Sequence, residues 1–416
     1  MKKITIILIC IFLLQGCKND QRKLEKDRGN AHLKLKIDTL ELALSKIEKE
    51  SPIAGFAVAI VNSDSVIYQK GFGISNLETN KPYSSKTIQP LASISKTFIG
   101  ASIMILVDEG KLNLDESIND ILPYKIVNPF FPNEDIKIRH LVTHTSTITD
   151  DYEDIDGSIY WLLEDSKIDQ FESSKELKGR ISYFKLGNPI ELDEYITNIC
   201  LPKSKWYSRD NFLNDKPGSR FEYSNLGASI AARIVEIKSG ESFKQFTEKS
   251  IFQPLGMTNT GWFYEDVDSE LLSNLYELDS LNKPIRFPRY HEAGYPEGQL
   301  KSNAEDMSKY LIEMIKGYSG NGSLLSNSSY KVLFTPQLNI NHFDERSDYE
   351  FDDEYNLGVF WAISKAGLRL HNGAMDGVYS FLYLNPETNI AAIAFCNMPD
   401  NSFGEIRSEI RSFEKE

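Results

Sequence analysis

The pattern of hydrophobic positions predicts a helix and then a β-hairpin near the start of the chain. Apolar residues between Leu33 and Ile47 recur with three- and four-residue spacing, so we expect an amphipathic helix over residues 32–50. Two short runs rich in Val, Ile and Phe follow, at 53–61 and 66–72, with four polar residues between them. Runs of this kind joined by a polar turn are typical of a hairpin.

A second helix is expected to be buried. Residues 94–107 are apolar on nearly every side, and Gly110 follows in the position of a helix cap. A helix without a polar face has no side that it can turn to water. We therefore place this helix at the centre of a domain.

The middle of the chain has a helical pattern, and strand patterns return near its end. Between 111 and 299, helical periodicity is clear around 226–238 and 242–252, whereas alternating runs are few. The later strand-like runs are 357–363, 368–371, 378–384 and 390–395, and a closing helix is expected over 403–413. Strands at both ends predict one sheet built from both termini, with a long insertion between them.

The first residues have the pattern of an export signal. Lys2 and Lys3 precede an apolar run that ends at Leu14 and leads into Gln15-Gly16-Cys17. The run is too short to span a membrane, which takes about 20 apolar residues. A Cys after a small residue resembles the lipobox of bacterial lipoproteins, which implies cleavage before Cys17 and lipidation of its sulfur. The expected location is then the periplasmic side of a membrane or the cell surface, and an uncleaved amino-terminal anchor is the alternative.

Charge and cysteine content narrow the class of protein further. The 416 residues include 46 Lys and Arg against 60 Asp and Glu, a formal net charge of −14. Nucleic-acid binders depend on clustered basic residues, and no basic stripe occurs in the sequence, so nucleic acid is not an expected partner. Apart from the amino-terminal thiols only Cys200 and Cys396 remain, and we expect both to be inert core residues.

The strongest candidate for chemistry is a Ser and a Lys three positions apart. Ser93 and Lys96 lie at the start of the buried helix, where side chains at this spacing share one face. A Ser hydroxyl needs a neighbouring base before it can act as a nucleophile, and burial favours the neutral form of a Lys that could be that base. The spacing recurs elsewhere in the chain, so a structural role is the alternative for the isolated pair.

Two further short motifs follow. Tyr223 and Asn225 stand just before an expected helix, where a phenol can relay a proton and an amide can hold a substrate carbonyl. His371 and Gly373 stand at the end of a predicted strand. The Gly would let a substrate approach the strand edge, and the amide that follows it could donate to an oxyanion. Each motif alone is also compatible with simple packing.

Taken together and in this order, the three motifs resemble the serine hydrolases that include class C β-lactamases, D-Ala-D-Ala carboxypeptidases, D-aminopeptidases and related esterases. Segments 110–115, 138–146, 254–257 and 300–307 also look like that family, so the resemblance covers about residues 51–400. It implies an α+β fold in which an antiparallel sheet is flanked by helices and carries an inserted, mostly helical domain. It implies no metal and no organic cofactor.

The resemblance also implies a role for each matching residue. Ser93 would be the acylated nucleophile, and Lys96 would accept its proton. Tyr223 would share the base role and activate the deacylating water, while His371 would orient the tyrosine hydroxyl or the substrate. The backbone amides of Ser93 and Ala374 would form the oxyanion hole. Asn225 and Gly373 would contact the substrate.

Three positions depart from the family. Thr147 follows His-Thr-Ser where the family usually has Gly, which puts the loop conformation in doubt. Gln299 stands where the family often has Gly-Gly-Leu, and we expect it to narrow the site. His371 replaces the Lys of most true β-lactamases of this class. Because a His is mostly neutral near pH 7 and holds a carboxylate less well, we favour esters or D-amino-acid-containing amides and peptides as substrates.

Other interpretations remain open on the sequence alone. The chain could be a β-lactamase, a catalytically silent surface binding protein, or a sensor that is acylated only once. His140 and His144, four apart on an expected helix, could share a metal but lack a third ligand. The acidic loop 344–354 lacks the spacing of a calcium site, and the segment 149–215 matches nothing that can be assigned.

These observations divide the chain into five segments. They are a lipoprotein signal over 1–16, a flexible tether over 17–31, an α/β part of a catalytic domain over 32–110, a helical insertion over 111–299 and a second α/β part over 300–416. The expected partners are a small ester, peptide or peptidoglycan-like substrate and a lipid membrane through Cys17. The sequence does not predict an oligomeric state.

Overall fold

The computed structural model describes residues 28–150, 159–163, 184–186, 190–279, 281–343 and 356–415. The predicted signal, Cys17, the tether up to residue 27, the acidic loop 344–354 and much of the segment 149–215 lie outside the described residues. In the part of the chain that the structure describes, no helix combines the length and the apolar character that a membrane span requires.

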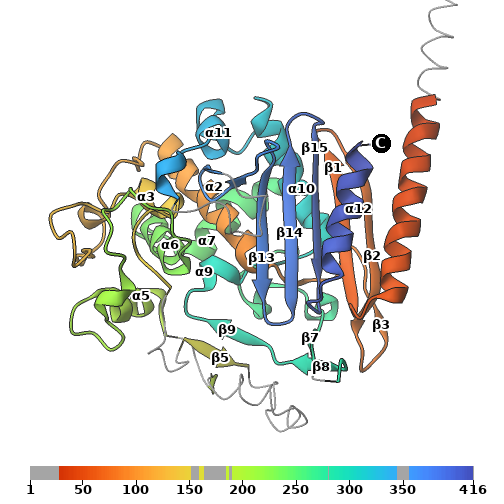
Figure 1. Ribbon diagram of the computed structural model, residues 1–416, viewed down its shortest axis with the longest axis horizontal. Coiled ribbons are helices and arrows are strands. Elements are labelled where there is room, and N and C mark those ends of the chain that lie inside the picture. The colour runs from red at the N-terminus through yellow and green to blue at the C-terminus, as the bar shows by residue number, and fades with distance from the viewer. Residues whose placement is uncertain are drawn as a thin grey trace, which may run out of the picture.

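Among the described residues, one antiparallel sheet of eight strands forms the centre of the fold (Figure 1). Its order is β11-β12-β13-β14-β15-β1-β2-β3. Strand β1 (Gly55–Asn62) pairs with β15 (Ile390–Cys396), so the first strand lies beside the last and the predicted sheet from both termini is confirmed. The other strands are β2 (Val66–Asn76), β3 (Lys81–Pro82), β11 (Asn356–Leu357), β12 (Ala362–Ile363), β13 (Arg369–Met375) and β14 (Val378–Asn385).

Two helices from opposite ends of the chain cover one face of the sheet. The first helix (residues 28–50) and α12 (Phe403–Lys415) pack with Phe56 of β1 in one hydrophobic cluster (Figure 1). The first helix already includes residues 28–31, so the prediction that the tether extends to residue 31 is wrong. These four residues are exposed and mostly polar, and apolar periodicity therefore gives no sign of the extra turn.

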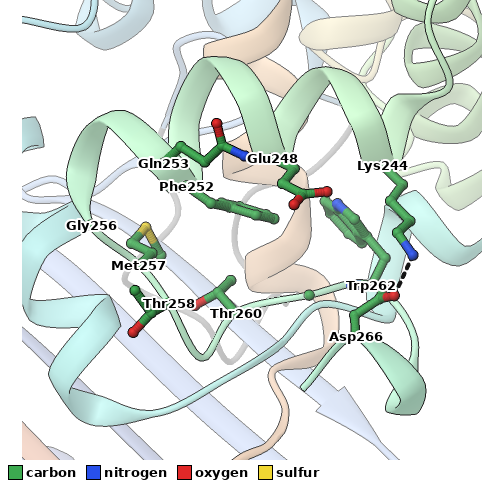
Figure 2. Close-up of a pocket in the computed structure, with 11 residues that line it drawn as sticks. Lys244, Glu248, Phe252, Gln253, Gly256, Met257, Thr258, Thr260, Trp262 and Asp266 are labelled. Atoms are coloured by element: carbon green, nitrogen blue, oxygen red, sulfur yellow. Dashed lines mark hydrogen bonds and ion pairs between the residues drawn. The ribbon is translucent and has the colours of Figure 1, made fainter. Parts of the chain in front are cut away.

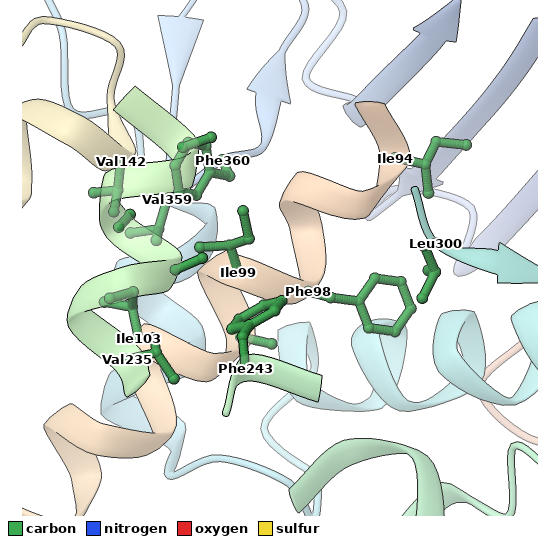
Figure 3. Packing of buried hydrophobic residues seen from close by; sticks show 14 of the residues in the cluster. Ile94, Phe98, Ile99, Ile103, Val142, Val235, Phe243, Leu300, Val359 and Phe360 are labelled. Atoms are coloured by element: carbon green, nitrogen blue, oxygen red, sulfur yellow. The ribbon is translucent and has the colours of Figure 1, made fainter. Parts of the chain in front are cut away.

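Helix α2 (Ser95–Asp108) covers the other face with α10 (Ala304–Tyr318) and runs through the main core, as the sequence predicts (Figure 3). Ile99 and Ile103 of α2 belong to the same buried cluster as Ala57 and Ala59 of β1. The alternation of β1 residues between two clusters is that of a strand buried on both faces.

The chain between 111 and 299 forms mostly helices, with short strands between them. The helix predicted at 226–238 is α6 (Asn225–Ser239). The helix predicted at 242–252 is divided into α7 (Phe243–Thr247), a π-helical turn η5 (Glu248–Phe252) and α8 (Gln253–Leu255). The other elements are η2 (Ile118–Asp120), α3 (Ile138–Val142), β5 (Tyr160–Leu162), β6 (Lys185–Leu186), α5 (Leu192–Cys200), η4 (Arg209–Asn211), η6 (Tyr264–Asp266), η7 (Ser269–Leu271), β7 (Leu275–Leu278), β8 (Pro284–Phe287), β9 (Tyr290–Glu292) and α9 (Tyr295–Gly298).

These strands of two to four residues are too short to display an alternating pattern, which is why the sequence indicates so few of them. The domain boundaries at 110 and 299 stay predictions. Beyond the insertion, the remaining helices are α11 (Asn327–Phe334) and η8 (Ile340–His342).

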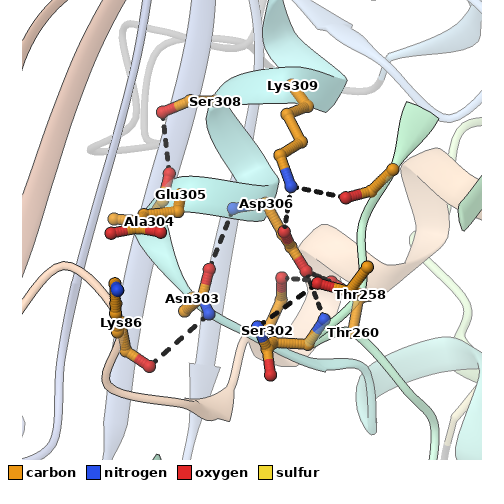
Figure 4. Close-up of polar contacts among 12 residues, drawn as sticks. Lys86, Thr258, Thr260, Ser302, Asn303, Ala304, Glu305, Asp306, Ser308 and Lys309 are labelled. Carbon is orange, nitrogen blue, oxygen red and sulfur yellow. Dashed lines mark hydrogen bonds and ion pairs between the residues drawn. The ribbon is translucent and has the colours of Figure 1, made fainter.

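A polar network ties the start of α10 to a neighbouring loop (Figure 4). Asn303 Oδ1 caps the helix by accepting from Asp306 N at 2.8 Å, and the Asp306 carboxylate accepts from Thr260 Oγ1 at 3.1 Å. Just before this cap, β10 (Lys301–Ser302) pairs with β4 (Gln89–Pro90). Strand β4 ends shortly before Ser93. The network therefore helps to fix the backbone that leads into the candidate nucleophile.

A surface cleft of about 540 Å³ lies beside η5 (Figure 2). Phe252 and Trp262 form part of its lining, and the ion pair of Lys244 with Asp266 lies at one end. None of the predicted site residues lines it.

Cys200 and Cys396 are both free and buried. Burial raises the pKa of both thiols, that of Cys396 to about 12. A thiol that stays protonated is a poor nucleophile, so both fit the prediction of inert core residues.

Candidate active site

The candidate nucleophile lies in a strained turn at the start of α2. Ser93 is the middle residue of the 3₁₀ turn η1 (Ala92–Ile94), which runs directly into the helix. Ala92 has a φ of 50°, in the left-handed region. Such a conformation costs a residue with a Cβ about 1–3 kcal/mol, and it persists only where the surroundings hold the backbone.

Strand β13 holds this turn, and the contact explains Gly373. A Cβ on Gly373 would lie 2.2 Å from Ser380 Oγ and 2.6 Å from Leu91 O. Ser380 Oγ in turn donates to Leu91 O at 2.7 Å. The sequence-based reason for this glycine was access of a substrate to the strand edge. The structure supplies a different reason, because the missing side chain lets β13 touch the turn that carries Ser93.

Lys96 is fully buried and makes three polar contacts. Its Nζ lies 3.2 Å from Ser93 Oγ, 2.7 Å from Asn225 Oδ1 and 2.7 Å from Glu297 O. The amide and peptide oxygens can only accept hydrogen bonds, so each of them takes one N–H of Lys96. The third direction of Nζ points to the Ser93 hydroxyl, which can either accept or donate.

Tyr223 lies over this pair, between two histidines. Lys96 Nζ is 5.1 Å from the centre of the Tyr223 ring. The ring stacks on His144, with centroids 4.4 Å apart, and meets His371 nearly edge-on at 6.5 Å. The structure therefore brings together Ser93, Lys96, Tyr223, Asn225 and His371, which are predicted from three separate stretches of sequence.

The start of α6 fixes Asn225. Ser224 caps the helix by accepting from Gly227 N at 2.8 Å. The carboxylate of Asp150 accepts from Asn225 N at 2.6 Å and from Leu226 N at 3.1 Å. An acid at a helix amino terminus pairs with its free amides and its dipole. Asp150 belongs to the segment 149–215, to which the sequence assigns nothing, and only its position at this helix start indicates what it does.

His144 is the main residue that sequence reasoning missed. Its Nδ1 accepts from Ser224 N at 3.1 Å, and its backbone oxygen accepts from Glu222 N at 2.8 Å. Burial, followed by the charges of Lys96 and His371, holds the pKa of His144 well below its usual range, so the ring is neutral. With Nδ1 as acceptor the proton is on Nε2, which has no hydrogen-bond partner among the described residues.

The expected helix carrying both His140 and His144 is wrong. Helix α3 (Ile138–Val142) ends before His144, whose φ of 53° lies in the left-handed region. His140 Nδ1 accepts from Lys137 N at 3.2 Å instead of facing a metal site. Within the described residues, no cluster of three metal-ligand side chains is found.

His371 is a neutral hydrogen-bond acceptor toward the site. Strand β13 (Arg369–Met375) continues through it, so the prediction that the strand ends there is wrong. Its Nδ1 lies 2.6 Å from Asn372 O, and because a carbonyl can only accept, Nδ1 carries the proton and Nε2 keeps a free electron pair. Burial, with a smaller effect of Lys96, lowers the pKa of His371 to about 4.

The edge of β13 beside His371 lacks a neighbouring strand in the described chain. Strand β12 pairs only with Arg369 and Leu370, so the segment from His371 to Met375 pairs on one side alone, with β14. Ala374, the predicted oxyanion donor, lies in this segment and is exposed. Its amide is therefore part of the same strand that packs on the turn of Ser93.

The two other departures from the family have structural explanations. Thr147 has a φ of 68°, which is unusual for a β-branched residue, and its Oγ1 accepts from Asn128 Nδ2 at 2.8 Å. Gln299 was expected to narrow the site. Its amide group instead donates to Glu292 and accepts from Lys301, and its side chain is buried.

A comparison with known protein families matches most of the chain. The family model described as Beta-lactamase matches residues 40–412. The chain belongs to the β-lactamase family. The predicted fold, an antiparallel sheet flanked by helices, is confirmed with it.

This β-lactamase-family chain matches only part of a longer curated relative. It is 24% identical over 347 residues to Protein flp of Staphylococcus aureus, an alignment that covers 83% of this chain and 60% of flp. The chain therefore spans about three fifths of the length of this relative.

Solved structures share the fold across most of the chain. The octameric penicillin-binding protein homologue from Pyrococcus abyssi has a TM-score of 0.66 and 25% identity, covering 87% of this chain and 73% of its own. EstCE1, a hydrolase with promiscuous acyltransferase activity, has a TM-score of 0.65 and 18% identity, with 93% and 100% covered. The D-amino acid amidase from Ochrobactrum anthropi SV3 has a TM-score of 0.63 and 18% identity, with 91% and 99% covered.

Proposed function

We propose that this protein is a serine hydrolase that forms an acyl-enzyme on Ser93 and acts on esters or on D-amino-acid-containing amides and peptides. The observation that carries the proposal is the set of contacts of Lys96. Two carbonyl oxygens take two of its N–H groups, and the remaining direction faces Ser93 Oγ at 3.2 Å. A neutral Lys held in this way directs its electron pair at the hydroxyl. The fold shared with an amidase and with EstCE1 supports this substrate range.

In the acylation step, Ser93 Oγ attacks the substrate carbonyl carbon and its proton moves to Lys96 Nζ. The electron pair of the carbonyl bond moves onto the oxygen, which the backbone amides of Ser93 and Ala374 stabilise. The intermediate collapses when the bond to the leaving group breaks and the leaving group takes a proton from the Lys96 and Tyr223 pair. The product of this half-reaction is an ester of Ser93.

Water ends the cycle by attacking this ester: the bond between the acyl carbon and Ser93 Oγ breaks, the carboxylic acid product leaves, and Ser93 Oγ takes a proton back from Lys96. Tyr223 lies between Lys96 and His371, so its hydroxyl can pass the proton of the attacking water toward Lys96. His371 Nε2 accepts a hydrogen bond and so orients the tyrosine hydroxyl or a substrate N–H. Asn225 keeps its NH₂ group available for the substrate, because its oxygen is bound to Lys96.

The neutral His371 disfavours the β-lactamase alternative. A substrate carboxylate is held best by a cation, and His371 with a pKa of about 4 offers an uncharged acceptor at neutral pH. We therefore expect neutral substrates to react faster than their anionic analogues.

Hydrolysis of p-nitrophenyl butyrate tests the proposed activity. We expect steady turnover by the purified protein, background rates for Ser93→Ala, and a loss of about 10²–10⁴ in kcat for Lys96→Ala. Ser328→Ala is a matched control because Ser328 also has a Lys three positions later, on α11 (Asn327–Phe334), and it should keep full activity. Equal rates for wild type and Ser93→Ala would overturn the proposal, and a burst without turnover would identify a protein that is acylated only once.

We also propose that the mature protein is an exported lipoprotein held to a membrane through Cys17. The proposal rests on the apolar run and the Gly16-Cys17 junction of the sequence. Labelling of bacterial cells with an alkyne-bearing fatty acid should tag the wild-type chain in the membrane fraction but not Cys17→Ser. Equal labelling of both chains would contradict it.

A further inference from the structure

A buried lysine lies behind the candidate nucleophile, and the mechanism above does not use it. Lys301, the first residue of β10 (Lys301–Ser302), is fully buried. A charged side chain stays in the interior only where its hydrogen bonds offset the loss of contact with water. The contacts of Lys301 therefore indicate which parts of the fold its side chain joins.

Three carbonyl oxygens surround the Lys301 side chain. Its Nζ donates to Trp262 O at 2.9 Å, to Gln299 O at 2.8 Å and to Gln299 Oε1 at 2.9 Å. Because none of these oxygens can donate, the three bonds take all three N–H groups of an ammonium. Burial lowers the pKa of Lys301 to about 7, and the three acceptors oppose that shift because they bind the protonated form. One cation therefore joins the backbone at Trp262 to both the backbone and the side chain of Gln299.

Trp262 is a firm anchor for this cation. Its backbone N donates to Asp266 Oδ2 at 3.2 Å, and its Nε1 donates to Thr247 Oγ1 at 2.7 Å. The preceding residue, Gly261, pairs with the backbone of Lys301, whose N donates to Gly261 O at 2.8 Å. The cation is thus bound to a part of the fold that is itself held through backbone and side chain.

The segment 297–301 links this cation to Lys96. Gln299 N donates to Tyr295 O at 2.9 Å, which joins the residue to the end of α9 (Tyr295–Gly298). Two positions before Gln299, the backbone oxygen of Glu297 accepts from Lys96 Nζ at 2.7 Å. That bond takes one N–H of Lys96 and so helps to direct the rest of the amine toward Ser93. A displacement of Gln299 would move this acceptor.

The same segment holds the turn of Ser93 on both sides. Leu300 O accepts from Leu91 N at 2.8 Å, two residues before the nucleophile, and Leu300 N donates to Ser95 Oγ at 3.1 Å, two residues after it. The two neighbours of Leu300 in the chain are the residues that the ammonium joins. The contacts of the turn therefore lie at the centre of the segment that the cation fixes.

We propose that Lys301 is a positioning residue for the nucleophile, because its buried ammonium fixes the segment 297–301 and through it both Lys96 and the turn of Ser93. Gln299 is the second part of this arrangement, since its side-chain oxygen takes one N–H of the ammonium. Lys301 acts only through the segment, so it is not a catalytic residue. This inference rests on the proposed acylation of Ser93.

Single-turnover reactions with the protein in excess over p-nitrophenyl butyrate separate the rate constant of acylation from the affinity for the ester. Lys301→Met keeps the length of the side chain and removes its three N–H groups. We expect the acylation rate constant to fall about ten- to a hundredfold, because Lys96 and Ser93 lose their alignment. The protein concentration at half-saturation should change by less than about threefold, because the substrate contacts stay in place.

A remote buried acid provides the matched control. Glu313 on α10 is 5% exposed and accepts from Ser323 N, Leu324 N and the Tyr330 hydroxyl. Glu313→Gln therefore also disturbs a buried group with several hydrogen bonds. It should lower stability in urea unfolding and leave the acylation rate constant of the folded protein unchanged. An unchanged rate constant in Lys301→Met, or an equal fall in Glu313→Gln, would overturn the inference.

Gln299→Ala is a milder variant that keeps the ammonium. It removes one of the three acceptors and leaves Trp262 O and the backbone oxygen of residue 299 in place. We expect acylation to slow about threefold, less than in Lys301→Met, because the segment is then held by fewer bonds. If Lys301→Met does not fold, this variant decides, and a wild-type rate constant in it overturns the inference.

Hydrogen exchange gives a second readout that needs no reaction. The amides of Leu91 and Leu300 both bond across the contact between the segment and the turn. We expect both amides to exchange at least about tenfold faster in Lys301→Met and to stay near wild type in Glu313→Gln. Unchanged exchange in Lys301→Met overturns the inference even if Ser93 is the nucleophile. Equal release of p-nitrophenol by wild type and Ser93→Ala contradicts only the proposed function, because the exchange result does not depend on it.

Discussion

His144 stacks on Tyr223, with ring centroids 4.4 Å apart and ring planes inclined by 30°. The same imidazole accepts a hydrogen bond from Ser224 N, the residue that caps α6 (Asn225–Ser239). One buried side chain therefore fixes both the ring and the backbone of the Tyr-Ser-Asn motif. This relationship gives His144 a positioning role that a lone histidine in the sequence does not reveal.

Replacement of His144 by Asn should separate the two contacts. An Asn oxygen can accept from Ser224 N and tolerates the φ of 53°, but it offers no ring to Tyr223. We expect kcat to fall by about ten- to a hundredfold, because a displaced catalytic group loses its alignment, with a smaller change in KM. Steady-state kinetics and thermal unfolding of the variant would check this. A rise in KM as large as the fall in kcat, together with a loss of stability, would indicate a purely structural role.

Acid should destabilise the fold in a defined window. His140, His291 and His371 all have a pKa of about 4, chiefly because they are buried. An unfolded chain protonates these residues near pH 6.5, whereas the folded chain does so only near pH 4. Stability is therefore full above about pH 6.5 and is lost as the pH falls toward 4.

Urea unfolding at stepwise pH would measure that slope. We expect His140→Gln to make it shallower, since one buried histidine is then absent and His140 is not part of the catalytic group. A slope that is the same in both proteins would contradict this assignment of His140.

A cation at position 371 should change the preference for charged substrates. His371→Lys replaces a neutral acceptor by an ammonium beside Tyr223, which favours a substrate carboxylate. We expect the ratio of kcat/KM for a hemisuccinate ester over that for the matched butyrate ester to rise about tenfold. His371→Gln, which adds no charge, should leave the ratio near that of wild type.

The backbone at Thr147 should prefer glycine. Its φ of 68° strains any residue with a Cβ, and both Thr147→Gly and Thr147→Ala lose the contact with Asn128 equally. The difference between these two variants therefore isolates the backbone. We expect the Gly variant to be more stable by roughly 1 kcal/mol in urea unfolding. A more stable Ala variant would contradict the strain.

Local sequence patterns predicted that Ser93 and Lys96 lie next to each other. The relative placement of Ser93 and Lys96 follows from a helix start alone, because side chains three positions apart lie on the same face of a helix. The sheet from both termini also followed from short runs of β-branched residues. By contrast, His371 and Gly373 were placed at a strand end, because a polar residue and a glycine interrupt the apolar pattern while the backbone pairing of β13 (Arg369–Met375) continues through them.

The residues that sequence reasoning missed act through distant contacts. Asp150 and His144 meet at the start of α6 from a separate stretch of the chain. No local spacing identifies such partners, since each is an ordinary polar residue within its own segment. The extra turn of the first helix was missed for a related reason, as it buries no side chain.

Trapping of the acyl-enzyme tests the central claim most directly. The protein is mixed with p-nitrophenyl butyrate, quenched in acid within the first turnover, digested and analysed by mass spectrometry. We predict one butyryl group on the peptide that contains Ser93, more of it in Tyr223→Phe because deacylation is slower, and none in Ser93→Ala. Turnover without a modified Ser93, or a butyryl group on another residue that accounts for the activity, would contradict the account.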